Sequence, residues 1–272
     1  MKNVFKLTNK YIIVATPLIL YSLISNIYMF VSLKGRGLIG VVFSILLLFL
    51  MTTAFLAGWG RMLKSAVTDC ADSEPNSIIK DFAPGVGEYF IPACGLLGVI
   101  CLINILVLVL SYIAGIHFIG HLGISADAFA KAFVSIESLK LFVASLTAEQ
   151  IIKINLWNML LIASIAVTYF ILMFCYPALY FDTKNPLKAI FLSVKHIFSR
   201  KLLVAAGIYL LIFFINIVIS LCFALTAGNV ILNFIMTLTN FYFISCVAIG
   251  IFYYYNETFI KLHLGKSIDK YV

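Results

Sequence analysis

Three ionisable residues, Arg61, Glu88 and Glu257, stand near the ends of long apolar segments and are the side chains best placed to form a functional site. A charge inside hydrocarbon is costly, so such a residue indicates function unless it lies at headgroup depth. Glu88 lies at the start of the third apolar segment, and Glu257 lies near the end of the sixth, just after three consecutive tyrosines. The two carboxylates either anchor their helices at the interface or converge with Arg61 in a polar cluster at the cytoplasmic face.

A second candidate site is the stretch DTKNPLKAIFLSVKHIFSRK, residues 182–201, which is too polar to cross a membrane comfortably. Asn185 and Pro186 predict a helix start, with the asparagine as N-cap and the proline in the first turn. The expected helix, 185–201, has an apolar stripe at helical spacing and lysines on another face. Such a helix lies on a membrane surface, where it binds anionic lipid or a cytoplasmic partner. The binding residues that we expect are Lys184, Lys188, Lys195, Arg200 and Lys201.

The sequence contains few residues or motifs that could catalyse a reaction. His117 and His121 have the spacing of two metal ligands on one helical face, with Asp127 as a third ligand, but no further ligands cluster there. The motifs HExxH and GxSxG and the phosphate-binding P-loop are absent from the sequence. We therefore expect no catalytic residues, no metal site, no cofactor and no enzymatic activity.

The composition is that of a polytopic membrane protein. Of the 272 residues, 63% are hydrophobic and 11% are charged, and the mean hydropathy is +1.11. We expect an all-α fold in one integral membrane domain, residues 1–272, surrounded by membrane lipids and with no nucleic-acid partner; the oligomeric state is left open. A helix of about 20 apolar residues crosses the hydrocarbon. The six expected spans are 11–33, 38–59, 87–115, 156–181, 202–225 and 230–260.

The distribution of basic residues predicts the orientation of these spans. With both termini in the cytoplasm, 14 of the 19 lysines and arginines fall on the cytoplasmic side and 5 on the outer side. The outer connection 116–155 is long yet rich in phenylalanine and isoleucine, so we expect one or two helices there that cover the outer leaflet. Thr147 and Gln150 fit a capping box, which predicts that the fourth helix begins near Ala148.

Prolines and asparagines within the spans carry two further predictions. Pro17, Pro92 and Pro177 each lie near the cytoplasmic end of a span, where they either kink helices around an inward cavity or turn helix ends toward interfacial segments. Asparagines such as Asn26 and Asn104 are expected to hydrogen-bond a neighbouring helix.

Two segments resemble a known group of proteins. PALYFDTKNPLKAIFLSVKHIFSRKLLVAAGIYLL, residues 177–211, and IGIFYYYNETF, residues 249–259, resemble bacterial six-span membrane proteins that include the membrane domain associated with glycerophosphodiester phosphodiesterases. The resemblance implies a six-span fold in which no catalytic residue carries over. The excess of lysine over arginine, 16 against 3, fits a bacterial cell membrane.

The function we expect is that of a non-catalytic membrane scaffold or accessory protein. Its basic amphipathic inner-face helices would bind anionic lipid or a cytoplasmic partner. The alternative is a transporter component, either a permease or a membrane subunit on which helix 185–201 contacts a separate ATPase.

Overall fold

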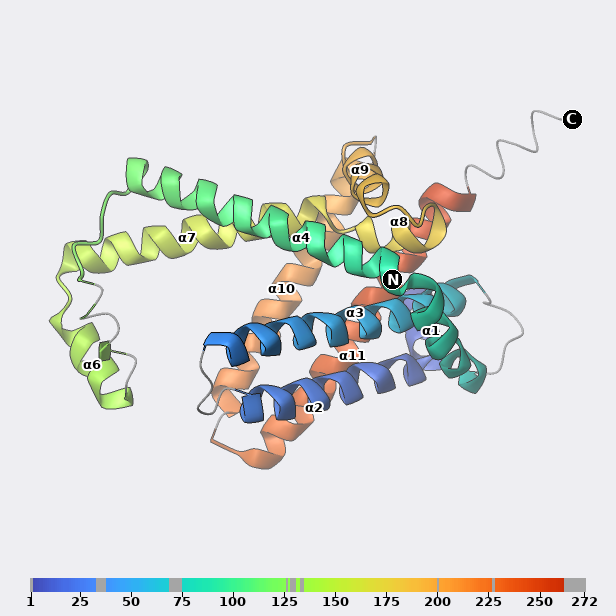
Figure 1. The fold of residues 1–272 in the computed structure, drawn as a ribbon, viewed down its shortest axis with the longest axis horizontal. Helices are drawn as coiled ribbons and strands as arrows, with labels where there is room; N and C mark the ends of the chain where they lie inside the picture. Colours follow the sequence, from blue (N-terminus) through green and yellow to red (C-terminus); the bar gives the residue numbers. More distant parts are fainter. Residues whose placement is uncertain are drawn as a thin grey trace, which may run out of the picture. The chain divides into compact units, whose positions relative to one another are not determined.

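The chain is almost entirely helical. The structure is a computed structural model. It describes residues 2–32, 38–68, 75–125, 127, 131–132, 135–199, 201–226 and 228–261. Within these ranges every regular element is a helix, and six helical segments are long and apolar enough to cross a membrane (Figure 1). The predicted all-α fold with six transmembrane helices is therefore confirmed. Many large apolar side chains on these helices are exposed, as expected of surfaces that contact lipid.

The helices follow the predicted spans closely, and three of the spans are longer than predicted. α3 continues beyond residue 59, α4 begins earlier than residue 87, and α7 begins at Ala148, as its capping box predicted. The Thr147 amide donates to Gln150 Oε1 at 3.0 Å, and the Gln150 amide donates to Thr147 Oγ1 at 3.2 Å. The elements are α1 Lys2–Lys10, η1 Ile12–Val14, α2 Ala15–Ser32, α3 Leu38–Thr68, η2 Pro75–Asp81, α4 Phe82–Phe118, α6 Ile136–Ser145, α7 Ala148–Ile171, α8 Cys175–Phe181, α9 Pro186–Ile197, α10 Leu202–Thr226, α11 Val230–Tyr255 and η3 Asn256–Ile260.

The helices form two compact units, and both α4 and α7 contribute to each. Unit 1 consists of Met1–Val99 with Ile171–Val272, and unit 2 consists of Ile100–Phe170. In unit 1, α2 packs on α3, and both pack on α11. The helices α10 and α11 pack on each other, with Asn229 as N-cap of α11 (Figure 1).

The amino-terminal helix α1 packs along α11 in unit 1. Thr8 is fully buried there, and Tyr242 donates a hydrogen bond to Asn9 Oδ1 at 2.6 Å. η1 then leads into α2, and the Trp59 indole donates to the Val14 carbonyl at 2.8 Å. The first turn of α2, which contains Pro17, is therefore fixed to α3 through a carbonyl that precedes the helix.

Two asparagines of the spans bond their own helices, whereas hydroxyl groups bond between helices. The amides of Asn26 and Asn104 donate to carbonyls of their own helices, so the prediction of interhelical bonds was wrong for these two residues. A side chain four residues from a helical carbonyl reaches it without a neighbour. In contrast, the Tyr21 and Thr52 hydroxyls bond each other between α2 and α3 at 2.7 Å.

Unit 2 is built from the second part of α4, α6, and all of α7 but its last residue. Ser111 of α4 donates to Ser164 Oγ of α7 at 2.8 Å. The Trp157 ring covers Gly115, where a β-carbon would lie 2.2 Å from it, and the indole donates to the Gly120 carbonyl at 3.3 Å. α6 begins with a capping box formed by Ser135 and Ser138. A helix is thus present in the connection 116–155, as the sequence predicted.

A break in the fourth span separates α7 from α8. Ser193 of α9 is fully buried at this break; its hydroxyl donates to the Ile171 carbonyl at 2.7 Å and accepts from the Phe174 amide at 3.1 Å. Pro177 follows in the first turn of α8, where a missing amide proton costs no helical hydrogen bond. One side chain from α9 therefore satisfies the two backbone groups that the break exposes.

Replacing Ser193 by alanine is expected to lower the free energy of unfolding by about 1–3 kcal/mol, because two buried backbone groups lose their partner. Titration with a denaturing detergent in mixed micelles measures this change. The matched control is Ser44→Ala, since the Ser44 hydroxyl donates to the Gly40 carbonyl of its own helix at 2.8 Å. Equal stabilities of the two variants would contradict the prediction.

Candidate functional site

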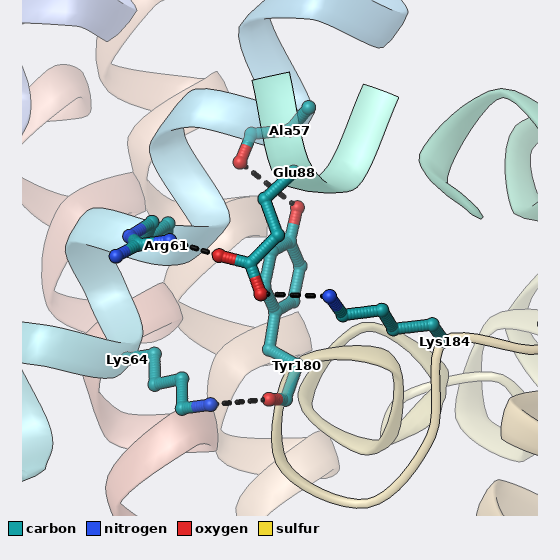
Figure 2. A network of polar contacts seen from close by, with 6 residues as sticks. All are labelled: Ala57, Arg61, Lys64, Glu88, Tyr180 and Lys184. Atoms are coloured by element: carbon teal, nitrogen blue, oxygen red, sulfur yellow. Dashed lines mark hydrogen bonds and ion pairs between the residues drawn. The ribbon is translucent and has the colours of Figure 1, made fainter. Parts of the chain in front are cut away.

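The Glu88 carboxylate is the centre of a polar cluster in unit 1. It accepts from Arg61 of α3 through one oxygen, and its other oxygen lies 2.9 Å from Lys184 Nζ. Figure 2 shows the two cations approaching the carboxylate from different sides. Glu88 itself belongs to the first turns of α4, so the carboxylate ties together α3, α4 and the turn before α9.

Tyr180 of α8 forms the second part of the cluster. Its hydroxyl donates to the carbonyls of Leu56 at 2.7 Å and Ala57 at 3.3 Å. Its own backbone carbonyl accepts from Lys64 Nζ at 2.8 Å, and Figure 2 shows this bond with the one to Ala57. The ring occupies the space beside Gly60, where any β-carbon would lie 2.2 Å from a ring carbon. Gly60 is therefore required for the close approach of α8 to α3.

Aromatic rings close the cluster on the side of α11. Tyr255, fully buried at the end of α11, donates to the Asp182 carboxylate. The Tyr255 ring stacks on Phe181 with centroids 6.1 Å apart, and the His196 ring stacks on Phe259 at 3.9 Å. These contacts hold the end of α11 and the segment η3 against α8 and α9.

The helix α9 has three faces. Its buried face packs on α8 through Ala189, Ser193 and Ile197. The exposed surface combines an apolar stripe with a basic edge, and the stripe lies in helical register because its members are separated by four and seven residues. The exposed residues are Leu187, Phe191 and Phe198 on the stripe and Lys188 and Lys195 on the edge.

The start of α9 is fixed by its neighbours. Asn185 Oδ1 accepts from the Lys188 amide at 3.2 Å, as predicted for an N-cap. Pro186 packs on Gly95 of α4, where a β-carbon would lie 2.7 Å from Pro186 Cγ. The helix therefore emerges from the polar cluster at a set position.

The structure separates the candidate residues named from the sequence into three groups. Arg61 and Glu88 are in contact, and Lys184 joins them instead of lying on α9. Lys188 and Lys195 are exposed on α9, and Lys201 is exposed before α10. Arg200 lies outside the described residues. Glu257 pairs with Lys261 four residues later.

Two members of the cluster were missed by reasoning from the sequence. Lys64 lies one turn after Arg61 on α3, so helical spacing could have placed it there. Tyr180 gave no such signal, because its hydroxyl bonds a backbone carbonyl more than a hundred residues away in the chain. The positions that we expected for Glu88 and Arg61 gave no reason to place Tyr180 beside them.

Among the residues that the structure describes, the cluster carries more positive than negative charge. Arg61, Lys64 and Lys184 surround the single carboxylate of Glu88. Accepting a hydrogen bond from the Lys184 ammonium, Glu88 raises the pKa of that lysine above its ordinary value of 10.5. Lys184 is thus protonated throughout the physiological range, and the arrangement favours binding of an anion over proton transfer. Within the described ranges, no group of three or more His, Cys, Asp and Glu side chains is placed to hold a metal ion.

Comparison of the chain with protein-family models, with curated proteins and with solved structures found no match. The geometry of unit 1 and the residues on it therefore carry the functional argument.

Replacing Glu88 by glutamine is expected to lower the free energy of unfolding by about 1 kcal/mol, because two partly exposed ion pairs are lost while the side-chain shape is kept. Unfolding in mixed micelles at low and high salt measures the effect, which should shrink at high salt. Glu149→Gln is the control, since it removes a single exposed pair with Lys153 within α7. A Glu88→Gln protein as stable as wild type at low salt would contradict this role.

Above neutral pH, the contribution of Lys184 to stability should be lost only at the alkaline end, while the Glu88 carboxylate stays ionised. Because its pKa is raised on folding, the gain is fully present below the unfolded value of 10.5 and is lost as the pH rises through the higher folded value. The difference in unfolding midpoint between wild type and Lys184→Met, followed from about pH 7 to about pH 12, tests this. Lys188→Met serves as control on the exposed edge of α9. A difference that vanishes before pH 10 would refute the assignment.

Proposed function

We propose that this chain is a non-catalytic integral membrane protein of a bacterial cell membrane, a scaffold or accessory protein that binds anionic lipid through α9. The observation that carries the proposal is the arrangement of faces on α9. Its inner face is buried on the bundle, while its outer face presents an apolar stripe beside lysines.

The apolar stripe of α9 fits the boundary between headgroups and acyl chains. Leu187, Phe191 and Phe198 are each about two-thirds exposed, although the helix is already packed on α8. Apolar side chains on a short helix at the end of a span can enter the acyl boundary while neighbouring lysines contact headgroups. Lys188 and Lys195 stand at the edge of the stripe, where charge complementarity selects an anionic surface.

The contacts in unit 1 support a cytoplasmic position for this face. They bring the carboxyl-terminal part of α3, the start of α4, the turn before α9 and the end of α11 together. In six successive crossings these four ends belong to one side of the membrane. That side also holds the larger share of lysine and arginine, which supports a cytoplasmic position for it and for both termini.

The resemblance to membrane domains associated with glycerophosphodiester phosphodiesterases supports an accessory role, because it brings no catalytic residues to this chain. An exposed apolar helix with lysines can also bind a protein. Recovery of a separate ATPase bound to α9 would therefore identify a transporter subunit in place of the proposed lipid-binding protein.

The test is the double variant Lys188→Gln/Lys195→Gln. Each lysine near an anionic surface contributes about 1 kcal/mol, so the double variant should bind phosphatidylglycerol about 30-fold more weakly. Purification through a carboxyl-terminal tag in mild detergent, followed by mass spectrometry of retained lipids and proteins, measures binding. Hydrogen exchange in nanodiscs should show α9 protected more strongly in phosphatidylglycerol than in phosphatidylcholine.

Lys140→Gln is the matched control, since this exposed lysine of α6 belongs to the connection 116–155. It should leave lipid retention unchanged. Equal protection of α9 in the two lipids, or unchanged retention in the double variant, would overturn the proposal.

A further inference from the structure

A partly open apolar cavity of about 230 Å³ lies in unit 1, and the lining residue Gly60 packs against Tyr180 of the polar cluster. Its walls come from α3, from the break between α7 and α8, and from α11. Lining side chains include Leu56, Trp59, Leu63, Met173, Pro177 and Phe252. An apolar cavity excludes water, so its natural occupant is an apolar group.

The cavity is held open by groups that are fixed elsewhere. The Trp59 indole is bonded to the Val14 carbonyl, and the backbone at the break is held by Ser193. Tyr180 fills the space beside Gly60 and is bonded to the Leu56 carbonyl. These buried hydrogen bonds hold Trp59 and the backbone at the break in place, so part of the cavity wall is fixed before any ligand binds.

A cation, Lys64, lies outside the lining of this cavity but is one residue from it along α3. Lys64 follows the lining residue Leu63 on α3, and its ammonium lies 5.6 Å from the centre of the Phe181 ring. Phe181 in turn contacts Phe252, another lining residue, with centroids 6.1 Å apart. Lys64 bonds the Tyr180 carbonyl, but none of the ion pairs formed among the described residues includes it.

Burying an ammonium group at the end of a membrane span is costly unless an anion pairs with it. Glu88 is already engaged by Arg61 and Lys184, so this carboxylate contributes attraction at a distance without a direct contact to Lys64. Three cations around one carboxylate leave positive charge beside an apolar cavity. A chemical group that fits both features is amphiphilic, with an anionic head and a hydrocarbon tail.

We infer that unit 1 binds one anionic amphiphile, with a hydrocarbon chain in the cavity and its carboxylate or phosphate at Lys64. The cavity is smaller than the roughly 300–1,000 Å³ of drug-sized sites, so it takes part of one chain. This site differs from the proposed surface of α9. It holds a single molecule per chain and is expected to saturate, whereas α9 contacts the leaflet as a whole.

The probes are a photoactivatable palmitic acid, a phosphatidylglycerol that carries the same photoactivatable chain, and the corresponding neutral fatty alcohol. Each is added to the full chain in nanodiscs of phosphatidylcholine, and the labelled peptides are identified by mass spectrometry. The expected result is saturable labelling of peptides that contain Leu63 or Met173 by an anionic probe, at least tenfold above the neutral alcohol. Labelling by the free acid alone identifies a fatty-acid site, and labelling by phosphatidylglycerol identifies a lipid-headgroup site.

Two variants separate the tail from the head. Ala248→Leu fills the cavity from α11 and should reduce labelling by every probe at least tenfold, whereas Ala163→Leu, at an exposed alanine of α7, should not. Lys64→Met should reduce labelling by the anionic probes to the level of the alcohol.

Labelling that does not saturate, that is unchanged in both Ala248→Leu and Lys64→Met, or that is equally strong with the alcohol in wild type would overturn the inference. The comparison between probes in wild type decides the matter even if Ala248→Leu fails to fold. Loss of phosphatidylglycerol retention in the α9 double variant is a separate readout, so either proposal can fail without the other.

Discussion

The fold of unit 1 depends on the satisfaction of backbone groups at one break in a membrane helix. Hydrocarbon offers no partner for the Ile171 carbonyl or the Phe174 amide, and the buried hydroxyl of Ser193 bonds both. This requirement forces α9 to return against α8. The return brings Lys184 to Glu88, places Pro186 on Gly95, and leaves the outer face of α9 exposed.

Ion pairs and aromatic packing then hold the helices around the break together. Glu88 joins α3 and the turn before α9 through two cations, while Tyr180 and Tyr255 bond the α3 backbone and Asp182. The result is a polar layer at one end of the unit, next to an apolar cavity. Both proposals use this layer: α9 extends from it along the membrane surface, and Lys64 lies between it and the cavity.

Several features of the site followed from local sequence and others did not. The N-cap at Asn185 and the start of α7 at Ala148 depend on residues that signal helix ends, and these agree with the structure. The sequence left open whether Glu88 anchors its helix or contacts Arg61, because that contact joins two different helices; the structure shows the contact. The role of Lys184 did not follow, because helical spacing placed it on α9 whereas an ion pair with α4 holds it before the helix. Asn26 and Asn104 bond their own helices because a carbonyl four residues away is always within reach.

The sequence by itself determined the six apolar helices. Segment length and hydropathy are properties of local composition, and the thickness of the hydrocarbon sets what length and hydropathy a span needs. It also determined which residues of α9 form the apolar stripe and which form the basic edge, because helical periodicity assigns each residue to a face. Only the tertiary structure decided which face of α9 is buried, how Glu88 is shared between Arg61 and Lys184, and where the cavity lies. These features depend on contacts between residues far apart in the chain, such as Tyr180 with Leu56, whose geometry no local pattern encodes.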